Sequence, residues 1–202
     1  CVVVPMPAQR TRRTVLAGLV AAIAGGGGEQ GATTATSTPP MSNPAIGDVQ
    51  QRGDLRLTST AFDNGGRIPD RYGRDGENVN PPLSVGMVPD EATTLALIVD
   101  DPDAVPVGGE VFLHWLVWNV PASRTDIPAG WTPGTATVGE NDFGNRRYDG
   151  PAPPDREHTY RFKCYALRSA LNVPAAASKE EVGAAMRIEV LSQTQLTGRF
   201  AP

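Results

Sequence analysis

The chain has 202 residues, of which 40% are hydrophobic and 20% are charged. This composition is ordinary for a globular protein, and the length suffices for one well-packed domain with a tail. The formal net charge of -4 gives no basic surface field, so nucleic acid is excluded as an expected partner.

Residues 1–24 have the pattern of a targeting segment. Arg12 and Arg13 precede an uncharged apolar stretch over 15–24, which is too short for a transmembrane span. A basic region, a short apolar region and the ending Ala22-Ile23-Ala24 predict a secretory signal peptide. The arginine pair favours the twin-arginine route, so we expect export to the cell envelope or the extracellular space. The alternative is an unstructured N-terminal extension.

Residues 25–51 are expected to form a flexible linker. They are rich in Gly, Ala, Ser, Thr and Pro, and such a segment cannot bury enough apolar surface to offset its ordering entropy. A short strand or cap over 46–49 is the alternative. Residues 52–202 are expected to form the single domain, and the 22 glycines and 19 prolines of the chain suit strands joined by tight turns.

Short apolar or alternating segments predict strands throughout this domain. Residues 55–59 alternate like a half-buried strand, and 94–99 form an apolar run bounded by turn residues and too short for a typical helix. In 116–120 both alternating faces are apolar, which is typical of a strand covered on both sides. Further strands are expected over 83–85 and 158–167, and a last strand is expected over the two pieces 188–191 and 195–200.

One helix is expected, near the C-terminus. The sequence Ser178-Lys179-Glu180-Glu181 is a capping box, and Val182, Ala185 and Met186 then share one helix face. The segment 121–144 has little regular pattern. Because structureless loops of this length are uncommon and often functional, it is expected either to fold over a pocket or to cross the surface.

The two histidines of the chain each open an apolar strand, after a loop that holds proline and acid. Asp101 and Asp103 end one strand before His114, while His158 and Tyr160 share a strand face. Imidazole and phenol groups donate hydrogen bonds to the oxygens of an anion. Neighbouring carboxylates raise the pKa of an imidazole and fix its tautomer. These residues therefore predict a site for a phosphate or carboxylate group.

Each of these residues also has a structural interpretation. The aspartates beside Pro102 suit a turn, His114 suits a core position, and His158 could stack with Tyr160. Two histidines and an aspartate could also bind a metal. Because tight ligand spacing is lacking, no metal and no other cofactor is expected. Motifs of hydrolases such as G-x-S-x-G are lacking too, although an Asp–His pair can act as a general base.

Two separated motifs carry a family resemblance. Asp-Pro-Asp-Ala followed by His-Trp-Leu-Val-Trp-Asn-Val-Pro, and Tyr-Asp-Gly-Pro-Ala-Pro-Pro followed by His-Thr-Tyr-Arg-Phe, resemble the phosphatidylethanolamine-binding protein family. The likeness is closest to its prokaryotic Raf kinase inhibitor-like branch, and it runs from about residue 55 to the C-terminus. The resemblance implies a mainly β domain, a sandwich of two packed antiparallel sheets with one C-terminal helix.

The resemblance also implies a pocket at one rim that binds the phosphate of phospholipid headgroups and similar small anions. By this resemblance, the pocket residues of the family correspond to Asp101, His114, His158 and Tyr160. Two positions on the pocket wall correspond to Tyr148 and Pro153.

This sequence departs from the family pattern at three places. Val105 intervenes before Pro106, which changes the loop after the aspartates. Ala152 replaces a cysteine that many prokaryotic members have. Arg146 and Arg147 could recruit an acidic ligand at the mouth of the pocket, or could be solvated surface charge.

We therefore expect a non-enzymatic protein that binds a small anion or a phosphorylated headgroup. The first alternative is an interaction module that inhibits a kinase or a protease, since the family includes such inhibitors. The second alternative is a weak hydrolase.

Overall fold

The computed structural model describes residue 47 and residues 49–202. The predicted signal peptide and most of the predicted linker lie outside these residues. At the start of the described part, Val49 donates its N–H to Oε1 of Gln195 at 3.2 Å, and Arg52 forms a β-bridge with Gln193. None of the helices described here is long and apolar enough to cross a membrane.

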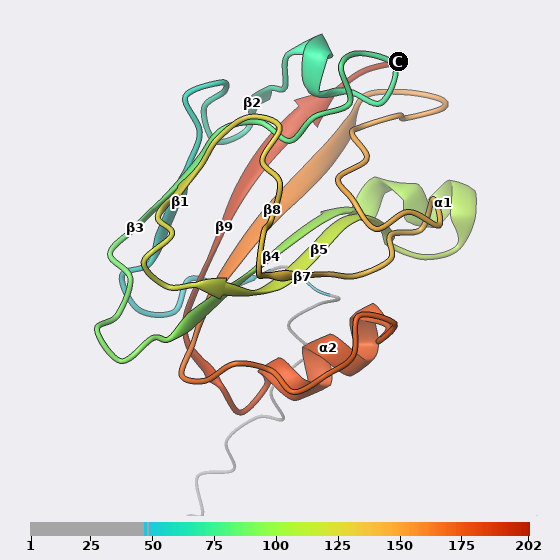
Figure 1. Ribbon diagram of the computed structural model, residues 1–202. Helices are drawn as coiled ribbons and strands as arrows, with labels where there is room; N and C mark the ends of the chain where they lie inside the picture. The colour runs from blue at the N-terminus through green and yellow to red at the C-terminus, as the bar shows by residue number, and fades with distance from the viewer. Residues whose placement is uncertain (1–46, 48) are drawn as a thin grey trace, which may run out of the picture. The chain divides into compact units, whose positions relative to one another are not determined.

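The strands form two sheets, as predicted, and Figure 1 shows their arrangement. The smaller sheet has the order β1-β3-β6, and the larger has the order β2-β9-β8-β4-β5-β7. All pairs are antiparallel except β2 with β9, which is parallel. The strand bounds are β1 Arg56–Thr58, β2 Gly66–Arg67, β3 Leu83–Gly86, β4 Thr94–Asp101, β5 Phe112–Pro121, β6 Asp126–Ile127, β7 Thr137–Val138, β8 His158–Leu167 and β9 Val190–Phe200.

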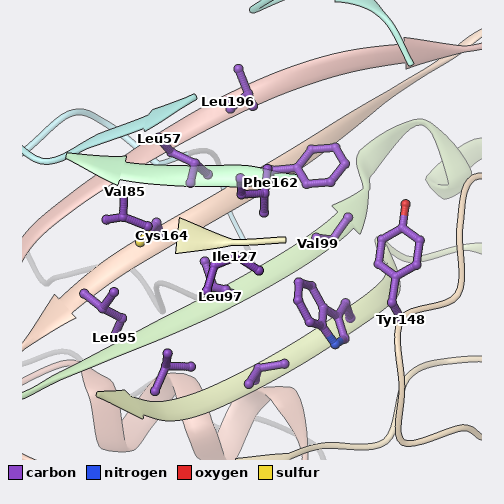
Figure 2. Close-up of a cluster of buried hydrophobic side chains, with 14 of the residues drawn as sticks. Leu57, Val85, Leu95, Leu97, Val99, Ile127, Tyr148, Phe162, Cys164 and Leu196 are labelled. Atoms are coloured by element: carbon purple, nitrogen blue, oxygen red, sulfur yellow. The ribbon is translucent and has the colours of Figure 1, made fainter. Parts of the chain in front are cut away.

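The main core lies between the two sheets. Leu57, Val85 and Ile127 of the smaller sheet belong to one buried cluster with Leu97 and Phe162 of the larger sheet (Figure 2). Strands β1 and β3 alternate between buried and exposed side chains, so only one face of the smaller sheet is covered. The alternation over residues 55–59 had predicted a half-buried strand, and β1 confirms it.

The other face of the larger sheet carries a second core. Helix α2, Lys179–Met186, packs Val182 and Met186 into a cluster with Leu116 and Trp118 of β5. Both faces of β5 are therefore buried, which confirms the strand predicted to be covered on both sides. The predicted capping box is also present, because Ser178 accepts from the N–H of Glu181, whose carboxylate accepts from the N–H of Ser178.

Three details differ from the sequence predictions. The loop with the inserted Val105 forms a short helix, α1, over Val105–Gly108, which ends at Gly109 with a φ of 87°. The long segment 121–144 contains the two-residue strands β6 and β7. The two expected C-terminal strand pieces form one continuous strand, β9, which starts after the exposed Ile188.

The position of β4 between β5 and β8 creates the polar rim. Because β4 is antiparallel to both neighbours, its end meets the beginnings of β5 and β8 at one edge of the sheet. Short 3₁₀ and α segments follow β4 at this edge, η2 at Pro102–Ala104 and then α1. This topology gathers Asp101, His114 and His158, which are more than 50 positions apart at their extremes, at one rim.

Candidate functional site

A cavity of about 230 Å³ lies at this rim, between α1, the start of β5 and the loop before β8. Most of its wall is apolar. Three polar side chains reach it, those of Asp101, His114 and His158. The other lining residues are Ala104, Val107, Gly108, Phe112, Phe143, Ala152 and Pro154.

Asp101 has both a structural and a site role. Its Oδ1 accepts the backbone N–H of Asp103 at 2.8 Å and so caps η2, as the turn interpretation of the sequence expected. Its Oδ2 accepts from Nδ1 of His158 at 2.7 Å. Asp103 in turn accepts the N–H of Thr159 at 2.8 Å, which ties the η2 turn to the start of β8. Asp103 therefore braces the rim and does not itself line the cavity.

His158 is held by two carboxylates. Nδ1 donates to Asp101, and Nε2 donates to Oδ1 of Asp155 at 2.9 Å. Carboxylates accept hydrogen bonds, so both ring nitrogens carry a proton and the ring is an imidazolium. Burial alone would lower the pKa of His158, but the hydrogen bonds and charges of Asp101 and Asp155 outweigh it and raise that pKa. The side chain of His158 is only 1% exposed, so this positive charge is buried.

His114 has the opposite protonation state. Its Nδ1 lies 2.8 Å from the carbonyl oxygen of Asp149 and donates to it. Burial lowers the pKa of His114 and outweighs the raising effects of that carbonyl and of Asp101. The ring is therefore neutral, with the proton on Nδ1, and Nε2 is left as a hydrogen-bond acceptor. Phe112, Phe143 and Tyr160 pack around the ring with centroid distances of 5.2 to 5.5 Å.

Tyr160 lies beside both histidines, with its ring edge-on to that of His114. Its hydroxyl is buried close to Asp101 and to the backbone of Ala152, but it makes no hydrogen bond of ordinary distance and angle to any residue in the described part of the chain. Burial, followed by the negative charge of Asp101, raises the pKa of this hydroxyl, so it stays protonated. An unpaired buried hydroxyl costs folding free energy.

A network that the sequence analysis missed holds the carbonyl that orients His114. The carboxylate of Asp149 is buried and accepts hydrogen bonds from Asn78, Asn141 and Asn145 at 2.8 to 2.9 Å. Arg147 adds an ion pair at 3.1 Å. Burial on its own would raise the pKa of Asp149, but these hydrogen bonds lower it, so the carboxylate stays charged. The asparagines are visible in the sequence, but nothing there indicates that they share Asp149 as a partner.

Two predicted wall residues, Tyr148 and Pro153, are not among the residues that line this cavity. The hydroxyl of Tyr148 donates to the carbonyl of Tyr72 at 3.2 Å, and its ring packs edge-on against Trp115, among the core side chains of Figure 2. Pro153 lines a neighbouring surface cavity with Arg67 and Phe200, and Ala152 belongs to the walls of both cavities.

Of the two interpretations of Arg146 and Arg147, the structure is in line with surface charge rather than with a place at the mouth of the pocket. Arg147 pairs with Asp149, and Arg146 lines a cavity near the start of α2, so neither lines the histidine pocket. Arg74 does lie beside the pocket, with its guanidinium 4.0 Å from the ring centroid of Phe143. Across residues 47 and 49–202 no group of three or more His, Cys, Asp or Glu side chains is arranged to hold a metal ion.

The two packed sheets and the histidine- and aspartate-lined pocket at their rim define a small β-sandwich protein of the ligand- or protein-binding kind. The chain belongs to the phosphatidylethanolamine-binding protein family, whose profile matches residues 58–201. This confirms the family named from the two sequence motifs.

Its relatives include archaeal and bacterial proteins. A UPF0098 protein of Methanothermobacter thermautotrophicus is 44% identical over 151 residues, which are 72% of this chain and 98% of that protein. The crystal structure of a putative phosphatidylethanolamine-binding protein homologue from Chlamydia trachomatis is 35% identical, with a TM-score of 0.68, and the match covers 72% of this chain and 95% of that one. The structure of YbcL from E. coli is 28% identical, with a TM-score of 0.67, over 72% and 97% of the two chains. These matches confirm the prokaryotic branch of the family.

Proposed function

We propose that the protein binds a small anion, a phosphate group or a phosphorylated headgroup, in the rim pocket without chemically changing it. The observation that carries this proposal is that two imidazoles lining one cavity have different partners: two carboxylates hold His158, and a backbone carbonyl holds Nδ1 of His114. Protonated His158 donates to an oxygen of the ligand, while neutral His114 accepts from a protonated oxygen or an amine. A singly protonated phosphate group matches both.

The size and lining of the cavity support a small ligand that is bound and not converted. A volume of about 230 Å³ is below the usual range for pockets that enclose drug-sized ligands, so a headgroup fits better than a whole lipid. Among the described residues that line the cavity there is no serine, threonine, cysteine or lysine to act as a covalent nucleophile. Ala152 lines the cavity at the position where many prokaryotic members of the family have a cysteine.

The test is calorimetric titration of the protein with inorganic phosphate and with sulfate at about pH 5.5. Sulfate carries the larger charge at this pH but has no proton to donate. If only positive charge attracts the ligand, sulfate binds more tightly. If Nε2 of His114 accepts a hydrogen bond, phosphate binds roughly tenfold more tightly or better, because sulfate leaves that acceptor unpaired.

Phosphoethanolamine titrated in the same way tests whether a headgroup is accepted. The double variant His114→Ala/His158→Ala should bind neither phosphate nor phosphoethanolamine, provided that urea unfolding shows that it is folded. Absence of heat with all three probes and the folded wild-type protein would remove the proposal. A search for a protein target would then be the next step.

A further inference from the structure

Asp155 occupies the one hydrogen-bond position on His158 that a ligand could take. Its Oδ1 accepts from Nε2 of His158 at 2.9 Å, and its Oδ2 accepts from Nη1 of Arg156 at 2.8 Å. Nδ1 of His158 is already engaged by the buried Asp101. An anion that binds through the positive charge of His158 must therefore meet Asp155 at Nε2.

The two carboxylates on His158 differ in how firmly they are held. The side chain of Asp101 is 5% exposed and also caps the η2 turn through Asp103. The side chain of Asp155 is 43% exposed, and it lies in the loop after Pro154, outside any strand or helix. Because Asp155 is half-exposed and holds no turn, strand or helix in place, water can solvate its carboxylate when it leaves His158, and the surrounding backbone need not move.

The contact with Arg156 makes this exchange easier. If Asp155 turns away from His158, its carboxylate keeps a positive partner in Arg156, which is itself half-exposed and also lies 3.7 Å from Asp103. Pro154, the residue directly before Asp155, is part of the cavity wall. The position that the carboxylate vacates is therefore next to the cavity that the ligand would enter.

We propose that Asp155 is an internal carboxylate ligand of His158, which an incoming anion must displace, and that it thereby determines which anions the pocket accepts. This inference rests on the proposed function. A protein whose binding-competent form is only partly populated binds its ligand more weakly by that fraction. Asp155 thus lowers the affinity for every anion.

The effect on selectivity follows from the chemistry of the exchange. A free monocarboxylate such as acetate offers His158 the same charged hydrogen-bond acceptor that Asp155 already provides. Replacing Asp155 by acetate therefore gains little binding free energy. Phosphate carries a proton that it can donate to Nε2 of His114 as well, and this second contact offsets the loss of Asp155. Asp155 therefore excludes simple carboxylates and admits phosphate.

The test compares Asp155→Ala with Glu157→Gln in titrations with inorganic phosphate and with acetate at about pH 6. Glu157 is the matched control, because it is half-exposed, lies two residues away and pairs with Arg199 at 3.1 Å instead of His158. Each variant removes one negative charge beside the pocket. We expect Asp155→Ala to bind phosphate roughly tenfold more tightly than the wild type, and Glu157→Gln to stay within about twofold. Acetate should bind measurably to Asp155→Ala alone.

A second readout needs no ligand. The NMR titration of the His158 ring should have its midpoint at lower pH in Asp155→Ala than in the wild type or in Glu157→Gln, because one of the two raising partners is gone. An unchanged midpoint would mean that Asp155 does not engage His158 in solution, and the inference would be wrong.

The binding outcomes separate this inference from the proposed function. If the wild type binds phosphate through His158 and Asp155→Ala binds no more tightly than Glu157→Gln, the internal competitor is refuted and the proposed function stands. If Asp155→Ala binds more weakly than the wild type, Asp155 is a partner of the ligand and the inference is also refuted. If neither the wild type nor Asp155→Ala binds phosphate, both fail.

Discussion

Removal of the buried carboxylate beside His158 should destabilise the protein, and by an amount that depends on pH. Asp101→Asn keeps the shape of the side chain and removes its charge. His158 is then a buried imidazolium, 1% exposed, whose remaining carboxylate partner Asp155 is 43% exposed. Loss of one partner of a buried ion pair costs about 3 kcal/mol or more. For a domain of this size, this corresponds to a shift of the urea midpoint of about 1.5 M.

The sign of the pH dependence follows from the raised pKa of His158 in the folded protein. The stabilisation that comes from proton binding is complete below the unfolded value of about 6.5, and it is lost as the pH rises through the folded pKa. Asp101→Asn should therefore lose about 3 kcal/mol at about pH 6. At a pH above the raised folded pKa of His158, where the ring is neutral, it should lose only about 1 kcal/mol, the value of an ordinary hydrogen bond.

Urea unfolding followed by tryptophan fluorescence at the two pH values measures both losses. Glu157→Gln is again the control, because it removes an exposed carboxylate paired with Arg199, and its loss should stay below about 1 kcal/mol at either pH. An equal loss for Asp101→Asn at both pH values would show that the charge on His158 is not what Asp101 stabilises.

Two further predictions concern buried groups near the site. Tyr160→Phe should leave stability unchanged or raise it by up to about 1 kcal/mol, whereas Tyr148→Phe should lower it by about 1 kcal/mol. The Tyr148 hydroxyl donates to the carbonyl of Tyr72 at 3.2 Å, while the Tyr160 hydroxyl makes no hydrogen bond of ordinary geometry to any described residue. Urea unfolding of the two variants compares them, and the reverse order would contradict the assignment. Gly150→Ala should cost about 3 kcal/mol, because its Cβ would overlap with the carbonyl oxygen of Tyr72, whereas Gly86→Ala, with its nearest contact at 3.8 Å, should cost less than about 1 kcal/mol in the same assay.

The sequence predicted those parts of the fold that depend only on residues close together in the chain. The capping box at Ser178 requires residues three positions apart, and the strand with two apolar faces, β5, needs only its own composition. The strands β6 and β7 escaped prediction because each has two residues and exists only through its partner strand. The helix α1 follows from Pro106 at its start and Gly109 after its end, a pattern too short to be distinguished from a loop.

The positions of the candidate site residues could be predicted from the sequence, but their contacts could not. Asp101, His114 and His158 could be placed at one rim because each stands at the end or the beginning of a predicted strand. The contacts that set their chemistry join residues far apart in the chain. His114 meets the carbonyl of Asp149 across 35 positions, and His158 meets Asp101 across 57. Such pairings follow from the register of the strands and the path of the loops, which no local pattern specifies.

These distant partners explain how two identical side chains on one cavity differ in charge. A carboxylate favours the protonated ring, because its negative charge offsets the cost of burying a cation. A backbone carbonyl fixes the tautomer but contributes only a dipole, so burial prevails and the ring stays neutral. If a carboxylate stood in place of the Asp149 carbonyl while His158 kept Asp101, His114 would also be protonated and would become a second donor. The pocket would then hold two donors and no acceptor, and it would no longer distinguish phosphate from sulfate. The selectivity we propose thus resides in residues 101, 149 and 155 as much as in the histidines themselves.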